Sequence, residues 1–250
     1  MRGPSLRVVS FSGLALLLAL GTNSAWLRTQ AGGEPRIPSY VAWTPESIHE
    51  ASSGDAFRGS LLVKRCDHCH GDEGFSPNAF MPNLAAIDRL SIWKQLEDFR
   101  TQKRVSPAMN PIAATLTPQD SADLAAYYSM LPVTSDPQDN RSFPQNGLAP
   151  AELTIASRLV SIGDSHRGVP PCQACHGPVG FIHGAASLAY QNADYFLNQL
   201  DAFAAGTRAN DINMPMRTIS RQLTEPERQA LAHYYGSGRG AHPTGATIAQ

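Results

Sequence analysis

The sequence predicts an all-α protein made of two similar helical domains in tandem, and an internal repeat is the main reason. Residues 93–99 recur as 196–203, and residues 116–128 recur as 223–235. Within these segments the apolar side chains follow helical spacing, and no alternating strand pattern is found. Each half is therefore expected to run helix, cysteine motif, loop, helix, loop, helix.

The expected helices follow in order along the chain. Short apolar-periodic runs at 56–65 and 153–162 lead towards the two cysteine motifs, and longer ones lie at 91–101 and 193–204. The last helix of each half begins after a threonine, Thr117 or Thr224, which is followed by a proline in the first turn and an acidic residue at the third position. This pattern is typical of a capped helix start. Residues 131–150 contain four prolines and are expected to form an extended linker.

The N-terminus indicates export. Arg2 and Arg7 precede or flank an apolar run at 8–21, which is shorter than the roughly 20 residues that span a bilayer. Small residues follow, so a signal peptide cleaved after Ala25 is expected, with an uncleaved membrane anchor as the alternative. The expected organisation is a signal peptide at 1–25, an N-terminal extension at 26–52, domains at 53–135 and 151–238, a linker at 136–150 and a tail at 239–250.

Two copies of Cys-x-x-Cys-His, at 66–70 and 172–176, contain all four cysteines of the chain. This motif is typical of c-type haem attachment, in which the thiols bond to the two vinyl groups and the histidine binds the iron. Two covalently bound haem c groups are therefore predicted. The predicted attachment residues and histidine ligands are Cys66, Cys69 and His70 in the first half, and Cys172, Cys175 and His176 in the second.

Three other uses of paired cysteines fit less well. Structural zinc sites usually combine ligand pairs from two knuckles, whereas each pair here belongs to its own long repeat. A thioredoxin-like dithiol expects a βαβ pattern, and the flanks here are helical. Disulfides between cysteines three apart would be strained and would leave the following histidine unexplained.

Methionines are candidates for the second iron ligand. Met109 and Met216 stand at the same distance before the last helix of their halves, each in a loop that contains proline. Met81 and Met214 have no methionine at the aligned place in the other half, and Met130 falls near a helix end. The predicted metal ligands are therefore His70 with Met109 and His176 with Met216.

Both halves resemble class I cytochrome c domains, and the whole is similar to the dihaem cytochrome c4 family. The resemblance runs from about residue 54 to 236 and depends on 66–71, Met109, 116–128, 172–177, Met216 and the start of the last repeat at 223. It implies a periplasmic electron carrier whose two domains are related by an approximate twofold axis. It also implies that the Pro82 carbonyl accepts a hydrogen bond from His70. Ala186 stands at the aligned place in the second half, so the equivalent bond there is left open.

Three functions are compatible with these features. The first is an electron carrier between a quinol-oxidising complex and a terminal oxidase, and the second is the electron-accepting subunit of a periplasmic dehydrogenase. The third, a dihaem peroxidase or thiosulfate-oxidising enzyme, would need an open iron position, and the matched methionines argue against it; no catalytic residue is expected. With a net charge of −1 and no basic patch, nothing indicates a nucleic-acid partner, and none is expected. Arg104 and Arg208 precede the methionines and either pair with haem propionates or are solvated.

Overall fold

The computed structural model describes residues 43–132, 148–177 and 182–239, which are helices and loops apart from one isolated β-bridge between Asp164 and Val169. The predicted all-α class is confirmed for this part of the chain. The described residues belong to one compact unit, Arg36–Gln250, and form two hydrophobic clusters. None of their helices has the length and apolar character needed to cross a membrane. The expected signal peptide and most of the linker and tail lie outside the described residues, and the domain limits stay a prediction.

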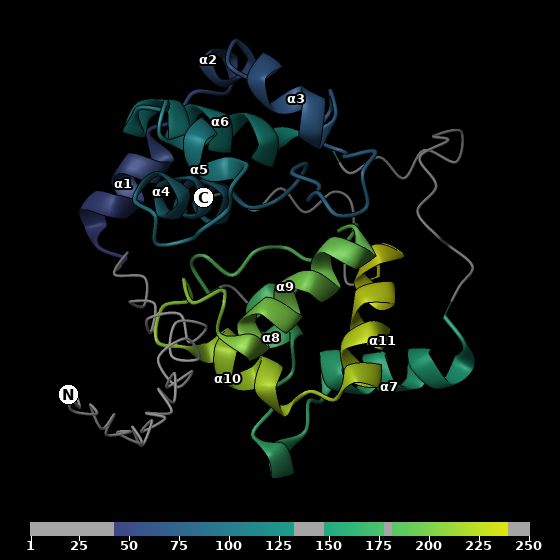
Figure 1. Cartoon of the computed structure of the whole chain (residues 1–250). Coiled ribbons are helices and arrows are strands. Elements are labelled where there is room, and N and C mark those ends of the chain that lie inside the picture. The colour runs from purple at the N-terminus through teal and green to yellow at the C-terminus, as the bar shows by residue number, and fades with distance from the viewer. Residues whose placement is uncertain (1–42, 133–147, 178–181, 240–250) are drawn as a thin grey trace, which may run out of the picture. The chain divides into compact units, whose positions relative to one another are not determined.

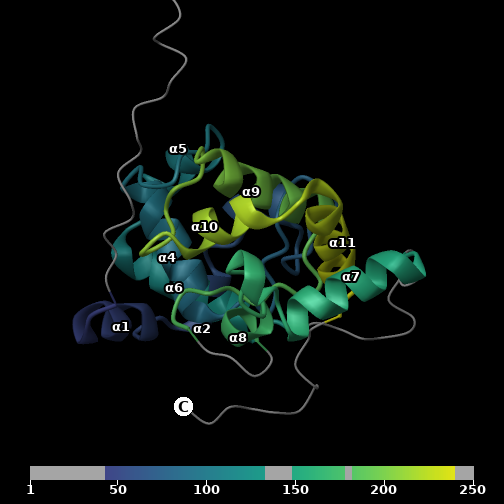
Figure 2. The same ribbon diagram turned by 90° about the horizontal axis from the view of Figure 1, so that it is seen from below.

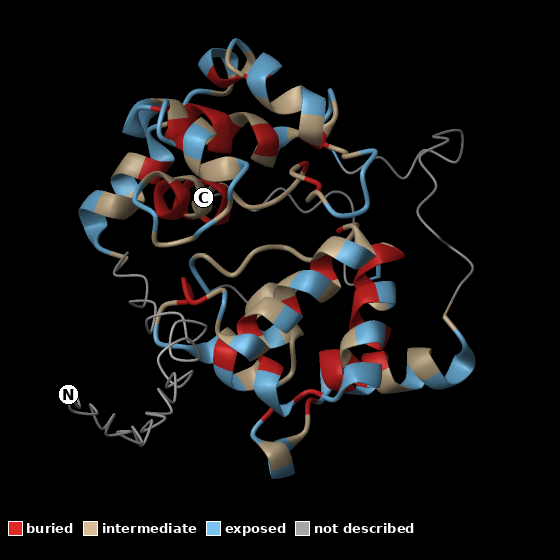
Figure 3. Cartoon of the chain, in the orientation of Figure 1, coloured by how far each residue is buried: buried red, intermediate tan, exposed pale blue. Residues whose placement is uncertain are grey.

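The first lobe, residues 43–132, is built around α6. Its helices are α1 (Pro45–Ser52), α2 (Ala56–Ser60), α3 (Lys64–His70), α4 (Arg89–Arg100), α5 (Met109–Ala113) and α6 (Pro118–Met130), as Figure 1 shows. Helix α6 packs against α1, α2 and α4. Several of its residues are buried, as the colouring of Figure 3 shows. Leu124 and Tyr128 are its largest fully buried side chains.

The second lobe, described at 148–177 and 182–239, repeats this plan around α11. Its helices are α7 (Pro150–Ser161), a 3₁₀ turn (Ser165–Arg167), α8 (Gln173–His176), α9 (Ala193–Ala205), α10 (Pro215–Gln222) and α11 (Glu225–Gly236). Helix α11 packs against α7 and α9, and α10 packs against α9 (Figures 1 and 2). Leu159, Phe196, Leu231 and Tyr235 are buried at the centre of this lobe.

The predicted helix starts after Thr117 and Thr224 are confirmed. The backbone N–H of Thr117 donates to the Asp120 carboxylate over 2.9 Å, and the backbone N–H of Asp120 donates to the Thr117 hydroxyl over 3.0 Å. The backbone N–H of Thr224 donates to Glu227 over 2.9 Å in the same way. Each capping box uses backbone donors that a helix start leaves without an intrahelical partner.

The helix expected over 56–65 is broken in the structure. Helix α2 ends at Ser60, and a separate helix, α3, begins at Lys64 and carries the cysteine motif. Helix α2 lies so close to α6 that a Cβ on Gly59 would come within 2.2 Å of the Asp123 carbonyl oxygen. The Arg58 guanidinium also binds the Asp123 carboxylate over 2.7 Å. These contacts fix α2 on α6, and α3 follows as a separate helix that carries the motif.

Candidate haem sites

Each Cys-x-x-Cys-His motif forms a short helix that ends directly after its histidine. Helix α3 ends at His70 and α8 at His176, and the next residues, Gly71 and Gly177, have φ angles of 77° and 72°. At Gly71 a Cβ would lie 2.0 Å from the Phe75 carbonyl oxygen, so this position requires glycine. The tight turn after each motif therefore fixes where the histidine side chain begins.

Both histidines are held by a backbone carbonyl. The Nδ1–H of His70 donates to the Pro82 carbonyl over 2.9 Å, and that of His176 donates to the Ala186 carbonyl over 2.8 Å. A carbonyl only accepts, so Nδ1 carries the proton and the lone pair of Nε2 is free for a metal. The structure thus provides the Pro82 bond that the resemblance implied, and it supplies the bond at Ala186 that the sequence left open.

Burial keeps both imidazoles in the form that binds a metal. Removal from water lowers the pKa of His70 and of His176, against the opposing effect of the carbonyl hydrogen bonds. A neutral imidazole is the metal-binding form of histidine. Each histidine is therefore oriented and deprotonated at the nitrogen that a metal would need.

The thiols are unbridged and partly buried. Burial raises the pKa of Cys66, and it raises the pKa of Cys172 to about 11. A tyrosine of the last helix of each lobe, Tyr128 or Tyr235, lies beside the first cysteine, and burial raises the pKa of both phenols. Both tyrosines are buried, so they are core residues that border each attachment segment.

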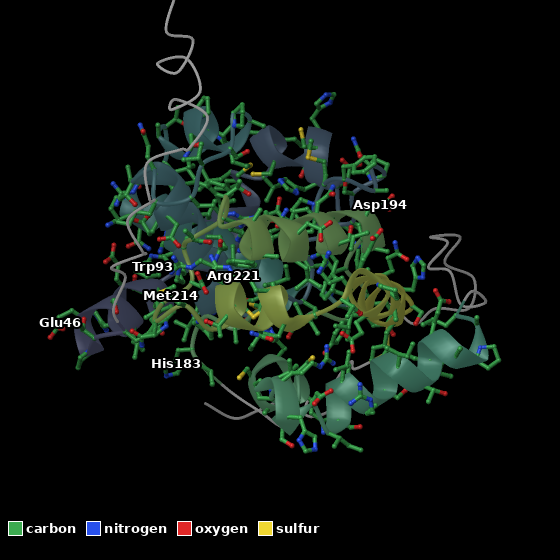
Figure 4. The ribbon with its side chains drawn as sticks, turned by 60° about the horizontal axis from the view of Figure 1, so that its bottom comes forward. Glu46, Trp93, His183, Asp194, Met214 and Arg221 are labelled. Atoms are coloured by element: carbon green, nitrogen blue, oxygen red, sulfur yellow. The ribbon has the colours of Figure 1, made fainter. Side chains whose placement is uncertain are left out.

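The methionines differ in exposure. Met109 is the first residue of α5, and Met216 lies in the first turn of α10; both are half-buried. Met216 packs against the same hydrophobic cluster as Cys172. Met130 is 69% exposed, and Met214, which precedes α10 and is labelled in Figure 4, is 40% exposed. The pairing of Met109 and Met216 with the two histidines stays a prediction.

Arg104 and Arg208 are not solvated side chains. Arg104 donates to Gln199 over 2.8 Å and to the Tyr195 hydroxyl over 2.9 Å, while Arg208 donates to Gln199 over 2.8 Å and to Gln95 over 3.1 Å. Each guanidinium also lies over a phenylalanine ring of its own lobe. Burial and the nearby Arg104 charge lower the pKa of Arg208 to about 9. Two cations held close together on neutral partners form a site suited to anionic groups.

Comparisons with known proteins identify the family of this chain. No protein-family model matches the chain. A cytochrome c4 from Thiocapsa roseopersicina is 36% identical over 74% of this chain and 95% of its own length. The chain belongs to the cytochrome c4 family. The thiosulfate dehydrogenase electron acceptor of Stutzerimonas stutzeri (strain A1501) is 38% identical to this cytochrome over 69% of the chain and 78% of its own length. The crystal structure of reduced recombinant cytochrome c4 from Pseudomonas stutzeri matches with a TM-score of 0.66 and 31% identity, covering 76% of this chain and 100% of that one.

This cytochrome is a dihaem electron-transfer protein that carries two covalently bound haem c groups. The residues present fit that cofactor. Each lobe offers two thiols and an imidazole with a free Nε2, and Arg104 and Arg208 suit the negative charge of haem propionates. When bound, haem supplies one-electron chemistry between ferric and ferrous iron. The expectation of an electron-transfer protein rather than an enzyme is confirmed by these relatives.

Proposed function

We propose that this cytochrome is a periplasmic carrier that moves electrons between respiratory redox partners through two haems, each with histidine and methionine axial ligands. The observation that carries the proposal is the matched pair of carbonyl hydrogen bonds to His70 and His176. Such bonds fix the tautomer and orientation of a metal-binding histidine and raise its basicity. Two equivalent sites prepared in this way favour two haems that both serve electron transfer.

An iron that is bound by both a histidine and a methionine would suit an electron carrier. A thioether ligand raises the reduction potential of haem, as in other cytochromes c with methionine and histidine ligands. The proposed ligands Met109 and Met216 are short of full burial and lie at the starts of α5 and α10. With both positions filled, no site is left for a substrate on iron, and the residues of the chain only hold and insulate the group.

The methionine ligands are tested by a matched pair of substitutions. Met216→Ala should turn one haem high-spin, remove its share of the near-infrared-edge band of methionine-ligated ferric haem and let carbon monoxide bind. Met214→Ala removes the exposed neighbouring thioether and should leave all three signals unchanged. Met109→Ala should affect the other haem. Normal spectra in Met216→Ala, or altered spectra in Met214→Ala, would contradict the assignment.

A second candidate function is favoured by one relative. The thiosulfate dehydrogenase electron acceptor of S. stutzeri shares 38% identity with this chain, so a role as electron-accepting subunit of a periplasmic dehydrogenase is the alternative. Stopped-flow reduction distinguishes the two. A free carrier should be reduced rapidly by a quinol-oxidising complex and elute alone on size exclusion. A dedicated acceptor should co-elute with the dehydrogenase and be reduced by it far faster.

Periplasmic location and membrane association are tested through the N-terminus. Expression of the full chain, with haem-stained fractions and N-terminal sequencing, should give a periplasmic protein that begins after Ala25. Recovery in the membrane fraction with an intact N-terminus would instead support the anchored form.

A further inference from the structure

The loop that carries the Pro82 carbonyl is held from both lobes, which belong to one compact unit. From its own lobe, the Asn83 side-chain oxygen accepts from the backbone N–H of Ser76 over 2.8 Å. Further hydrogen bonds to this loop come from residues 190–192, just before α9 in the second lobe. Because Pro82 is the acceptor for His70, whatever holds this loop also determines the position of that acceptor.

The Gln191 side chain both accepts from and donates to the backbone of Asn83, the residue after Pro82. Its side-chain oxygen accepts from the Asn83 N–H over 2.8 Å, and its side-chain NH₂ donates to the Asn83 carbonyl over 3.0 Å. The Asn83 side chain donates in return to the Tyr190 carbonyl over 2.6 Å. Gln191 and Asn83 are only 7% and 4% exposed. Buried amides paired this closely fix one backbone segment against the other, since breaking the pair would leave polar groups unsatisfied.

Asn192 binds backbone carbonyls on the other side of the same loop. Its NH₂ group donates to the Met81 carbonyl over 2.7 Å and to the Asn78 carbonyl over 3.1 Å. Asn192 is the N-cap residue of α9, where an asparagine normally accepts from the first turn, yet its side chain makes no capping bond. Asp88, the aligned N-cap of α4, does cap its own helix by accepting from Ser91 over 2.8 Å. Asn192 therefore forgoes a local bond in favour of the loop of the other lobe.

The Gln191 contact has no counterpart in the first lobe. The repeat places Ile87 at the position of Gln191 and Ser187 at the position of Asn83. An isoleucine side chain has no hydrogen-bonding atom, so it cannot form the equivalent of the Gln191 pair on the loop that carries Ala186. Asp88, the residue aligned with Asn192, does interact with the backbone of Ser187 in that loop. The two histidine sites are thus alike in their own bond but differ in what holds the acceptor.

We propose that Gln191 and Asn192 are positioning residues of the second lobe that hold the Pro82 carbonyl on Nδ1 of His70 in the first lobe. The second lobe then sets the donor strength of the first lobe's histidine, since a fixed acceptor raises imidazole basicity. The inference rests on the proposed role of His70 as an iron ligand. Its consequence is that a change in the second lobe alters the first haem and leaves the second one unchanged.

The test is Gln191→Leu, which removes both bonds to Asn83 at similar volume. In the reduced protein, NMR follows hydrogen exchange of the Nδ1 protons of His70 and His176. We expect exchange at His70 to speed up roughly five- to tenfold, the factor expected from the loss of one or two hydrogen bonds, with His176 unchanged within about twofold. The potential of the first haem should rise, because a weaker histidine donor stabilises ferric iron less. Asn198→Ala, at an exposed position on α9, is the control and should change neither.

A second variant separates positioning from stability. Asn192→Ser cannot reach Met81 or Asn78 but can cap α9, which contributes about 1 kcal/mol in other helices. We expect unchanged or higher thermal stability together with faster exchange at His70. The proposal would be overturned if either variant left the exchange rate at His70 unchanged, raised the rates at both histidines by the same factor, or changed the rate at His176 alone. If instead His70 were not an iron ligand, the unmodified protein itself would lack hyperfine-shifted His70 signals in its ferric state, so this failure is distinguishable from failure of the proposal.

Discussion

Neutralising Glu227 should remove an acid-sensitive part of the stability of the second lobe. Arg167 binds its carboxylate with two N–H groups over 2.9 and 2.6 Å, and the backbone N–H of Thr224 adds a third bond over 2.9 Å. The hydrogen bonds from Arg167, followed by those from Thr224, outweigh burial and lower the pKa of Glu227 from 4.5 to about 2. Arg167 stands in the turn before the second haem motif, so this contact ties α11 to the attachment segment.

The size of the effect follows from the shift. Each pKa unit corresponds to about 1.4 kcal/mol, so the shift is worth about 3 kcal/mol, or about 2 kcal/mol after allowance for the partial exposure of Arg167. Because the folded-state pKa is depressed, this stability is present above pH 4.5 and is lost as the pH falls towards 2. Glu227→Gln should therefore lower the free energy of unfolding at pH 7 by about 2 kcal/mol.

Denaturant unfolding, followed by far-UV circular dichroism at a series of pH values, measures this difference. The gap between the unmodified protein and Glu227→Gln should close between pH 4.5 and about 2. Asp120→Asn is the control, because Asp120 is the aligned capping residue of α6 in the first lobe. Asparagine keeps an acceptor oxygen for the Thr117 N–H, so this substitution should cost less than about 1 kcal/mol at pH 7. A gap for Glu227→Gln that stays constant from pH 7 to 2 would refute the reasoning.

Three further outcomes are expected. Cys66→Ala combined with Cys69→Ala should leave one haem per chain by pyridine haemochrome quantitation, and colour removed by acid–acetone would contradict covalent attachment. The unmodified protein should bind carbon monoxide slowly and turn over peroxide negligibly at neutral pH; rapid turnover with an exchangeable ligand would favour an enzyme. Tyr235→Phe should change the free energy of unfolding by less than about 1 kcal/mol, because its buried hydroxyl meets only the weakly accepting sulfur of Cys172, whereas Phe196→Ala should cost about 3–5 kcal/mol. Chemical denaturation measures both, and a large loss in Tyr235→Phe would show that its hydroxyl is bonded in the holoprotein.

The sequence was sufficient for features that depend on neighbouring residues. The two Cys-x-x-Cys-His motifs identify haem attachment because the chemistry needs those side chains at that spacing. The capped starts of α6 and α11 follow from Thr117 and Thr224, since a capping box is formed within one turn of chain. The repeat also singled out Met109 and Met216 as candidate ligands, and their pairing with the two histidines stays a prediction.

Other features were decided by the tertiary structure. Every residue has a backbone carbonyl, so nothing in the side chain of Ala186 indicated that it would hold His176. Arg104 and Arg208 were left open between solvent and propionates until the packing of their neighbours placed them on half-buried amides. Asn192 stands where local rules predict a helix cap, and its bonds reach instead to residues more than a hundred positions away. Motifs and helix caps are formed by residues close together in the sequence, so the sequence alone reveals them. A contact between distant segments exists only once both lobes have folded.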